Sequence, residues 1–304
     1  DGFQGITHSP THTYYNLGQA DSLFNVQLTS TSQYGCTDTD MDTVVVHPLP
    51  VADFTLSEIE GCSPLTVNIT DMSTGGGTYA WTYGDGLISY TTALSHDHTY
   101  VSSSTIPQEL DLNLLLATDF GCTSAETIEI TVFPPVNALF QTDEALCATE
   151  LFTFFNQSIG AATYQWNFGD GTGSSYVNPL HSYSNTSGVS QYFPVTILAT
   201  SQYACTDIYE DTLTVHSAPI AEIYIDSTST CHPLYVDFIN NSVFADSYIW
   251  DYGDGSNSSN GDSIHSHVFT NTSSFLVEYE IEMIAVTDFG CTDTSSTSVH
   301  MIPR

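Results

Sequence analysis

Basic residues are almost absent from this chain. Its 304 residues include 35 acidic residues but a single lysine or arginine, Arg304, and the formal net charge is −34. Charged residues make up 12 % of the sequence, about half of the roughly 25 % that is usual. A groove for nucleic acid needs lysine or arginine to replace the counterions of the phosphates, so we exclude nucleic acid as a partner. Attraction to an anionic membrane surface is excluded for the same reason.

Long apolar runs and closely spaced cysteine pairs are also missing. No stretch approaches the roughly 18 apolar residues of a membrane-spanning helix, so we expect no membrane insertion. None of the seven cysteines forms a Cys-x-x-Cys pair, which argues against a cysteine-bound metal. Hydrophobic residues nevertheless make up 41 % of the chain, with 18 Tyr and 16 Phe. This content supports folded cores, and the length favours two to four small domains.

Three motifs recur along the sequence at a nearly constant interval. Trp81-Thr-Tyr-Gly-Asp85-Gly86 returns twice, and the equivalent aspartates, Asp170 and Asp254, follow at almost equal steps. The second motif is a Cys-Thr pair that begins at Cys36, Cys122, Cys205 and Cys291. The third is a histidine two residues before Tyr or Phe, found at His12, His98, His181 and His267. Such periodicity indicates tandem copies of one structural unit.

The interval divides the chain into one incomplete and three complete repeats. Asp1-Gly2 aligns with Asp85-Gly86, so we expect the first repeat to lack its N-terminal strands. The predicted boundaries are a partial repeat at 1–48 and full repeats at 49–134, 135–217 and 218–304. This beginning indicates a window cut from a longer array. A neighbouring subunit that donates the missing strands is the alternative.

Each full repeat has the pattern of a small β-domain. Residues 127–132, 195–198 and 279–284 alternate between apolar and polar side chains, which predicts strands. Turn-forming residues interrupt the sequence at short intervals, and no segment has a helical period. We therefore predict an all-β chain of immunoglobulin-like sandwiches of about 85 residues each.

The cysteine spacing predicts one disulfide within each full repeat. The predicted pairs, Cys62–Cys122, Cys147–Cys205 and Cys231–Cys291, have nearly the same separation in sequence. Cys36 would be the second member of a pair whose first member precedes residue 1. Regular long-range pairs of this kind are typical of an oxidising, extracellular setting.

The order of the motifs resembles the PKD (polycystic kidney disease) domain across essentially the whole chain. The resemblance implies an immunoglobulin-like fold in an extracellular protein. It further implies a role in bacterial surface adhesins or as spacers in secreted enzymes, and this cysteine-bearing version is similar to repeats of Bacteroidota-type bacteria. Thr82 and Asn167 replace the Asp that commonly follows the Trp and that Asp251 retains, so we interpret these positions as structural.

The Gly-Asp-Gly aspartates and the motif histidines are the first candidate site. Asp85, Asp170 and Asp254 precede His98, His181 and His267 at a short and nearly constant spacing. An Asp–His contact at one end of the sandwich would lock a loop, and we favour this structural role over a catalytic one. A catalytic set would occur in one domain, whereas these residues recur in every full repeat.

Calcium is the second candidate. We expect Asp71 with Asp119, and Asp246 with Asp288, to stand at the same end of their sandwiches, where hard oxygen ligands suit Ca²⁺. The third repeat is poorer, since Ser158 and Gln202 take the comparable positions.

The sequence favours a secreted or cell-surface protein that is not an enzyme. We expect a structural or adhesive segment of a long repeat protein, such as a stalk, fibre or filament. Its partners would be further repeats of the same or neighbouring chains, with surface glycans or proteins as further candidates. The alternative is a spacer or glycan-binding module of a secreted enzyme that degrades polysaccharide or protein.

Overall fold

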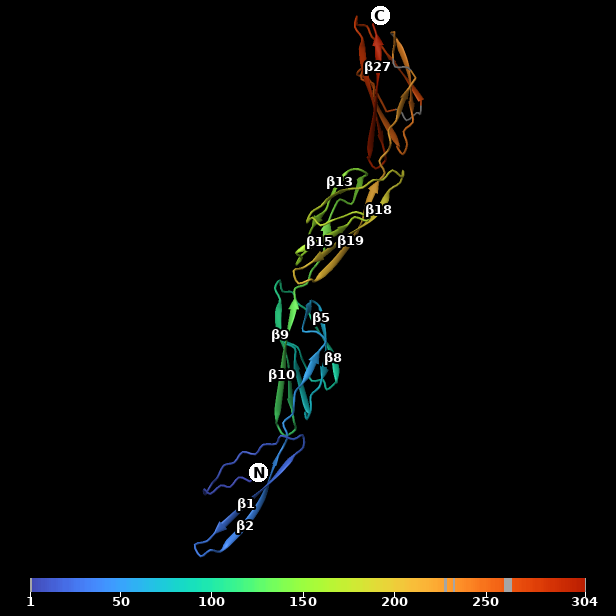
Figure 1. Cartoon of the computed structure of the whole chain (residues 1–304). Helices are drawn as coiled ribbons and strands as arrows, with labels where there is room; N and C mark the ends of the chain where they lie inside the picture. The colour runs from blue at the N-terminus through green and yellow to red at the C-terminus, as the bar shows by residue number, and fades with distance from the viewer. Residues whose placement is uncertain (1, 227–228, 232, 260–263, 304) are drawn as a thin grey trace. The chain divides into compact units, whose positions relative to one another are not determined.

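The protein consists of strands and loops. A computed structural model describes residues 2–226, 229–231, 233–259 and 264–303, and these residues contain no helix (Figure 1). None of the described segments is therefore a helix that could cross a membrane. The chain divides into two compact units, Asp1–Pro135 and Val136–Arg304.

The first unit contains a two-stranded sheet followed by a complete sandwich. Strands β1 (Ser22–Thr31) and β2 (Thr37–Val46) pair antiparallel along their whole length, from Ser22 opposite Val46 to Thr31 opposite Thr37. The sandwich has a three-stranded sheet of order β3-β5-β8 and a five-stranded sheet of order β4-β10-β9-β6-β7. Its strands are β3 (Phe54–Leu56), β4 (Glu60–Cys62), β5 (Leu65–Asp71), β6 (Thr78–Thr82), β7 (Ile88–Ser89), β8 (Ser95–Tyr100), β9 (Gln108–Ala117) and β10 (Thr123–Phe133).

The second unit contains two sandwiches with the same five-stranded sheet. In the first of them this sheet has the order β12-β19-β18-β15-β16, opposite the short pairs β11-β14 and β13-β17. Its strands are β11 (Phe140–Gln141), β12 (Ala145–Cys147), β13 (Leu151–Thr153), β14 (Phe155–Asn156), β15 (Thr163–Asn167), β16 (Gly173–Ser174), β17 (Leu180–Ser182), β18 (Gln191–Thr200) and β19 (Thr206–His216).

The last sandwich pairs a three-stranded sheet, β20-β22-β25, with a five-stranded sheet, β21-β27-β26-β23-β24. Its strands are β20 (Ile223–Ile225), β21 (Ser229–Cys231), β22 (Leu234–Asn240), β23 (Ser247–Asp251), β24 (Asn257–Ser258), β25 (Ile264–Phe269), β26 (Val277–Val286) and β27 (Thr292–Ile302). In every complete sandwich the three-residue strand that ends in cysteine runs parallel to the last strand, whereas the other pairings are antiparallel. The predicted all-β, immunoglobulin-like architecture is confirmed.

Each complete sandwich has its own hydrophobic core. Strand β5 shows how the sequence builds one, because Leu65, Val67 and Ile69 are buried while the residues between them are exposed. The motif tryptophans, Trp81, Trp166 and Trp250, are at most 4 % exposed. Trp166 packs edge-to-face on Phe140 with ring centroids 5.2 Å apart. The tryptophans are therefore core residues, which excludes them as an open platform for stacking sugars.

The loop that precedes each Cys-Thr pair has one conformation throughout the chain. In the last sandwich, the Thr287 amide donates to the Cys291 carbonyl, and the Cys291 amide donates to the Thr287 hydroxyl. The residue before the cysteine has a positive φ, which suits Gly35, Gly121 and Gly290. Ala204 takes this position in the third repeat with φ 63°, where a Cβ atom is unfavourable.

We expect Ala204→Gly to stabilise the protein by roughly 0.5–1 kcal/mol, because glycine removes the Cβ strain at positive φ and loses part of this gain to its larger unfolded-state entropy. Chemical denaturation measures the change. The matched control is Gly290→Ala at φ 83°, where an added Cβ meets no atom within 4 Å. This control should lose stability through backbone conformation alone. A loss of stability in Ala204→Gly would contradict the explanation.

Candidate functional site

The Gly-Asp-Gly aspartate and the motif histidine meet in all three complete sandwiches. The Nε2 atom of the histidine lies 2.8 Å from Oδ2 of the aspartate in the His98–Asp85 pair, 2.7 Å in His181–Asp170 and 2.8 Å in His267–Asp254. The histidine comes from the last strand of the smaller sheet, and the aspartate comes from the turn between two strands of the larger sheet. The pair therefore joins the two sheets of each sandwich.

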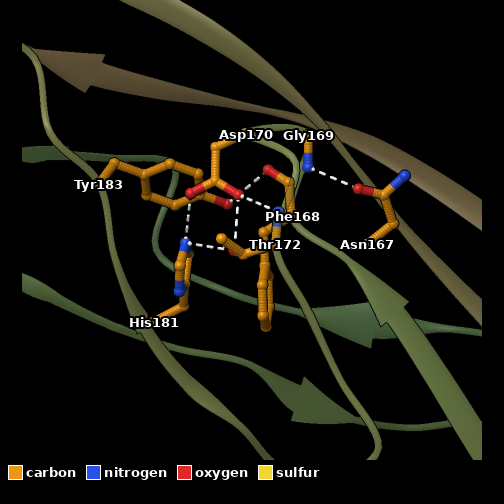
Figure 2. A network of polar contacts seen from close by, with 7 residues as sticks. All are labelled: Asn167, Phe168, Gly169, Asp170, Thr172, His181 and Tyr183. Atoms are coloured by element: carbon orange, nitrogen blue, oxygen red, sulfur yellow. Dashed lines mark hydrogen bonds and ion pairs between the residues drawn. The ribbon is translucent and has the colours of Figure 1, made fainter.

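Asp170 shows what one such aspartate does (Figure 2). Its Oδ1 atom accepts hydrogen bonds from the Thr172 amide at 2.9 Å and the Thr172 hydroxyl at 2.6 Å, while Oδ2 contacts His181. Just before it, the Gly169 amide donates to Oδ1 of Asn167 at 3.0 Å. One carboxylate thus closes the turn and holds the histidine of the opposite sheet.

Aromatic rings enclose the histidine. His181 stacks on Phe168 with ring centroids 4.2 Å apart and packs edge-on against Tyr183 at 4.7 Å. The buried Tyr183 hydroxyl donates to the Phe168 carbonyl at 2.9 Å, which closes the group on its inner side (Figure 2). The side chains of His181 and Asp170 keep only 17 % and 22 % of their exposure. The geometry fits a lock between sheets, with little room for a substrate.

Two of the aspartates have altered pKa values. Burial alone would raise the pKa of Asp170, but hydrogen bonds from Thr172 and His181 outweigh burial and lower it below its ordinary value. The same causes, with Ser256 and His267 as donors, lower the pKa of Asp254. Burial raises the pKa of the Tyr183 hydroxyl, so this group remains a donor at neutral pH.

The structure corrects the predicted disulfides. Cys147 is bonded to Cys291, with the Cα atoms 5.4 Å apart and a sequence separation of 144. This bond joins the two sandwiches of the second unit, so Cys147–Cys205 and Cys231–Cys291 are wrong. Cys122 is a free thiol, which makes Cys62–Cys122 wrong too. Cys62 and Cys205 each belong to a disulfide, Cys36 is free, and the side chain of Cys231 lies outside the described residues.

The length of the last strand explains why the pairs within a repeat cannot form. Cys147 lies opposite His216, the final residue of β19, whereas Cys205 stands directly before Thr206, the first residue of that strand. Eleven residues at about 3.3 Å each separate the two positions by roughly 35 Å, while bonded cysteines need Cα atoms within about 7 Å. The two cysteines of one repeat therefore sit at opposite ends of its sandwich.

Two of the four predicted calcium ligands accept hydrogen bonds from loop amides. Oδ2 of Asp246 accepts a hydrogen bond from the Asp288 amide at 2.7 Å, and Oδ1 of Asp71 accepts one from the Ser73 amide at 2.9 Å. Oδ1 of Asp119 lies 3.1 Å from the position that a Cβ on Gly77 would take. Within the described residues no three His, Cys, Asp or Glu side chains gather as metal ligands. Calcium at these four aspartates stays a prediction.

An asparagine in the loop after the motif histidine has a structural role that the sequence analysis did not predict. The side-chain amides of Asn185 and Asn271 each donate to two backbone carbonyls, which belong to Val189 and Val215 for Asn185. Asn16 makes the same pair of contacts in the partial repeat. The repeat pattern could have indicated this role, because each asparagine stands four residues after the motif histidine. It ties the loop that follows this histidine to the last strand.

No family model matches the chain, and no curated protein matches it. Among solved structures, the PKD1 domain of Vibrio anguillarum Epp is 25 % identical and covers 27 % of this chain and 95 % of its own, with a TM-score of 0.23. The ICAM-5 D1–D4 fragment is 9 % identical over 94 % of this chain and 84 % of its own, with a TM-score of 0.46.

A tetra-tandem repeat from the extending region of a large adhesion protein is also similar. It is 12 % identical over 94 % of this chain and 83 % of its own, with a TM-score of 0.29. Because all three TM-scores are below 0.5, the assignment as a tandem array of immunoglobulin-like sandwiches rests on the sheet order. A Trp-bearing strand within a five-stranded sheet, opposite a smaller sheet, is the arrangement of that fold.

We expect Asp170→Asn to destabilise the protein by roughly 1–2 kcal/mol at pH 7, because it removes the charge-assisted contact with His181. A lowered folded-state pKa adds stability that is complete above the unfolded-state pKa of about 4 and is lost as the pH falls through the folded-state value. Urea unfolding between pH 7 and pH 3 should therefore show a shallower decline for Asp170→Asn than for the wild type. The exposed control Asp143→Asn should change neither the stability at pH 7 nor its decline with falling pH appreciably.

Non-reducing peptide mapping should recover a fragment that joins Cys147 to Cys291. An aspartate-specific protease suits the digest, because the chain has 35 Asp and Glu residues and one basic residue. Reduction should separate the fragment and lower the melting temperature, since the bond restrains the unfolded chain. A fragment that joins Cys147 to Cys205 would contradict the structure.

Proposed function

We propose that this chain is a load-bearing segment of a long extracellular repeat protein, built from PKD-type sandwiches. The sequence resemblance supports a secreted or cell-surface bacterial protein of Bacteroidota type, in which these repeats form a stalk, fibre or filament. Its partners are further repeats of the same or neighbouring chains, and surface glycans or proteins are further candidates.

The disulfide between two sandwiches carries this proposal. When the second unit is pulled by its ends, tension passes from Cys147 directly to Cys291 through the covalent bond. Residues 148–290, which include most of both sandwiches, lie inside the closed loop and are shielded from extension. A disulfide within one sandwich would protect that sandwich alone. A bond across the junction is therefore suited to a chain that must resist stretching.

The composition supports an exposed structural role. Disulfides persist in oxidising, extracellular surroundings, and the chain has two bonds within the described residues. The Asp–His pair is repeated in every complete sandwich, which is typical of a structural element. A net charge of −34 also opposes close packing of neighbouring chains at low salt.

Single-molecule stretching tests the proposal. In a Cys62→Ser, Cys205→Ser background, the Cys147–Cys291 bond should hide residues 148–290 from extension. The further change Cys147→Ser should lengthen the fully unfolded chain by roughly 500 Å, at about 3.5 Å for each released residue. Cys36→Ser is the matched control and should leave the length unchanged. Equal lengths with and without Cys147 would overturn the load-bearing role of the bond.

The alternative is a spacer or glycan-binding module of a secreted enzyme that degrades polysaccharide or protein. Deletion of one complete repeat from the parent protein separates the two. A stalk should reach less far, by about the 35 Å of one eleven-residue strand, with its surface activity otherwise retained. A module that delivers an enzyme should instead lose activity on insoluble substrate while activity on soluble substrate is kept.

Calcium binding is proposed as an addition to this function. If Asp246 and Asp288 hold Ca²⁺, millimolar calcium should raise the melting temperature of the full chain, and Asp246→Asn should abolish the rise. Asp143→Asn removes an exposed carboxylate elsewhere and serves as the control. An unchanged melting temperature in calcium and in chelator would overturn this addition and leave the mechanical proposal untouched.

A further inference from the structure

The β1–β2 sheet lacks the edge strand that every complete five-stranded sheet has. In the complete sheets, a three-residue strand ending in cysteine runs parallel to the end of the last strand. Ala145–Cys147, for example, pairs with Thr214–His216. Alignment of Cys36 with Cys205 places the equivalent edge at residues 45–47. Within the described part of the chain, β2 pairs with β1 alone, so this edge is open.

The same sheet exposes the apolar face that is a core elsewhere. Val26, Leu28 and Val44 are 38 %, 67 % and 37 % exposed. The equivalent residues of the next repeat, Leu112, Leu114 and Ile130, are each 0 % exposed. In the complete sandwich the smaller sheet and the tryptophan of β6 cover this face. The side chains exposed on this sheet are therefore the ones that are covered in a complete sandwich.

The loop that carries Cys122 contacts the open edge. Phe120, two residues before Cys122, stacks on His47 with ring centroids 3.5 Å apart and the planes at 4°. In the second unit Phe289 stacks on His216 in the same way, at 3.9 Å and 9°, and Cys291 is bonded to Cys147.

The loops that carry the two cysteines also match. The Cys122 amide donates to the Thr118 hydroxyl at 3.1 Å, and the Cys291 amide donates to that of Thr287 at 3.0 Å. Cys147 reaches Cys291 because β12 pairs beside His216. A strand added beside His47 would bring its terminal cysteine to Cys122 by the same geometry.

We propose that the β1–β2 sheet and Cys122 form a docking site for a polypeptide segment of this repeat type. The segment places a cysteine-ended strand parallel to residues 45–47, covers the apolar face, and bonds its cysteine to Cys122. Two thiols become one disulfide, and their two electrons and two protons pass to a low-molecular-weight disulfide or a disulfide-exchange protein. The bond would join a docked half-sandwich to the sandwich that follows it.

A peptide of residues 136–169 provides the test, because it contains β11 to β15 and a single cysteine, Cys147. Its thiol is first converted to a mixed disulfide with 2-thiopyridine. The Cys122 thiolate of the full chain then attacks the peptide sulfur and releases pyridine-2-thione, so no external oxidant is needed. The released thione gives the rate, and mass spectrometry after digestion gives the cysteine that carries the peptide.

Cys36 is the internal control, since it is a free and exposed thiol at the far end of the β1–β2 hairpin, whereas Cys122 is partly buried. We expect the peptide to attach at Cys122 at least tenfold faster than at Cys36, and activated glutathione to show the reverse preference. Attachment should also protect the amides of residues 44–47 from hydrogen exchange. The change Cys122→Ser should abolish the fast reaction.

Three results would overturn the proposal. The first is equal or faster peptide attachment at Cys36. The second is an equally fast reaction with a peptide of the same composition and scrambled order around its cysteine. The third is a dimer linked by the Cys122 residues of both copies in the absence of peptide, because Cys122 would then pair with its own equivalent and with no cysteine-ended strand.

Discussion

The length of the last strand in each sandwich is the constraint on which the covalent structure depends. Strands β10, β19 and β27 are each eleven residues long, with one cysteine of the repeat beside their end and the other just before their start. A strand of this length holds the backbone positions of the two cysteines roughly 35 Å apart. The cysteines are consequently available only at the two ends of a sandwich, and the Cys147–Cys291 bond shows what such placement permits.

Most of the architecture could be predicted because local physics determines it. Period-two alternation fixes which side chains of β5 or β9 are buried, and the Gly-Asp-Gly turn requires positive φ on both sides of the aspartate. The Asp–His contact could be predicted from repetition, since two polar residues at nearly constant spacing in every complete sandwich are expected to act together. Their distances of 2.7–2.8 Å in three sandwiches agree with that expectation.

Pairing of the cysteines could not be predicted from spacing alone. Equal intervals in sequence fit pairs within a repeat and pairs between neighbouring repeats equally well, and the choice depends on which end of the sheet each residue occupies. Cys147 lies on a three-residue edge strand whose parallel partner is remote in sequence, so its position required the tertiary structure. The role of Asn185 could not be predicted for a different reason. Its side-chain amide donates to two backbone carbonyls, and one of them, that of Val215, is 30 residues away in the sequence.

The bond between Cys147 and Cys291 also changes what damage does to the chain. Backbone cleavage anywhere from residue 148 to 290 would leave the two fragments joined by the disulfide, so one cut does not separate the polypeptide into two pieces. Each half of a cut sandwich stays tethered beside its partner at high local concentration, which favours its return to the native pairing. Continuity of such a chain is lost only when a cut coincides with reduction, or when it falls outside the closed loop.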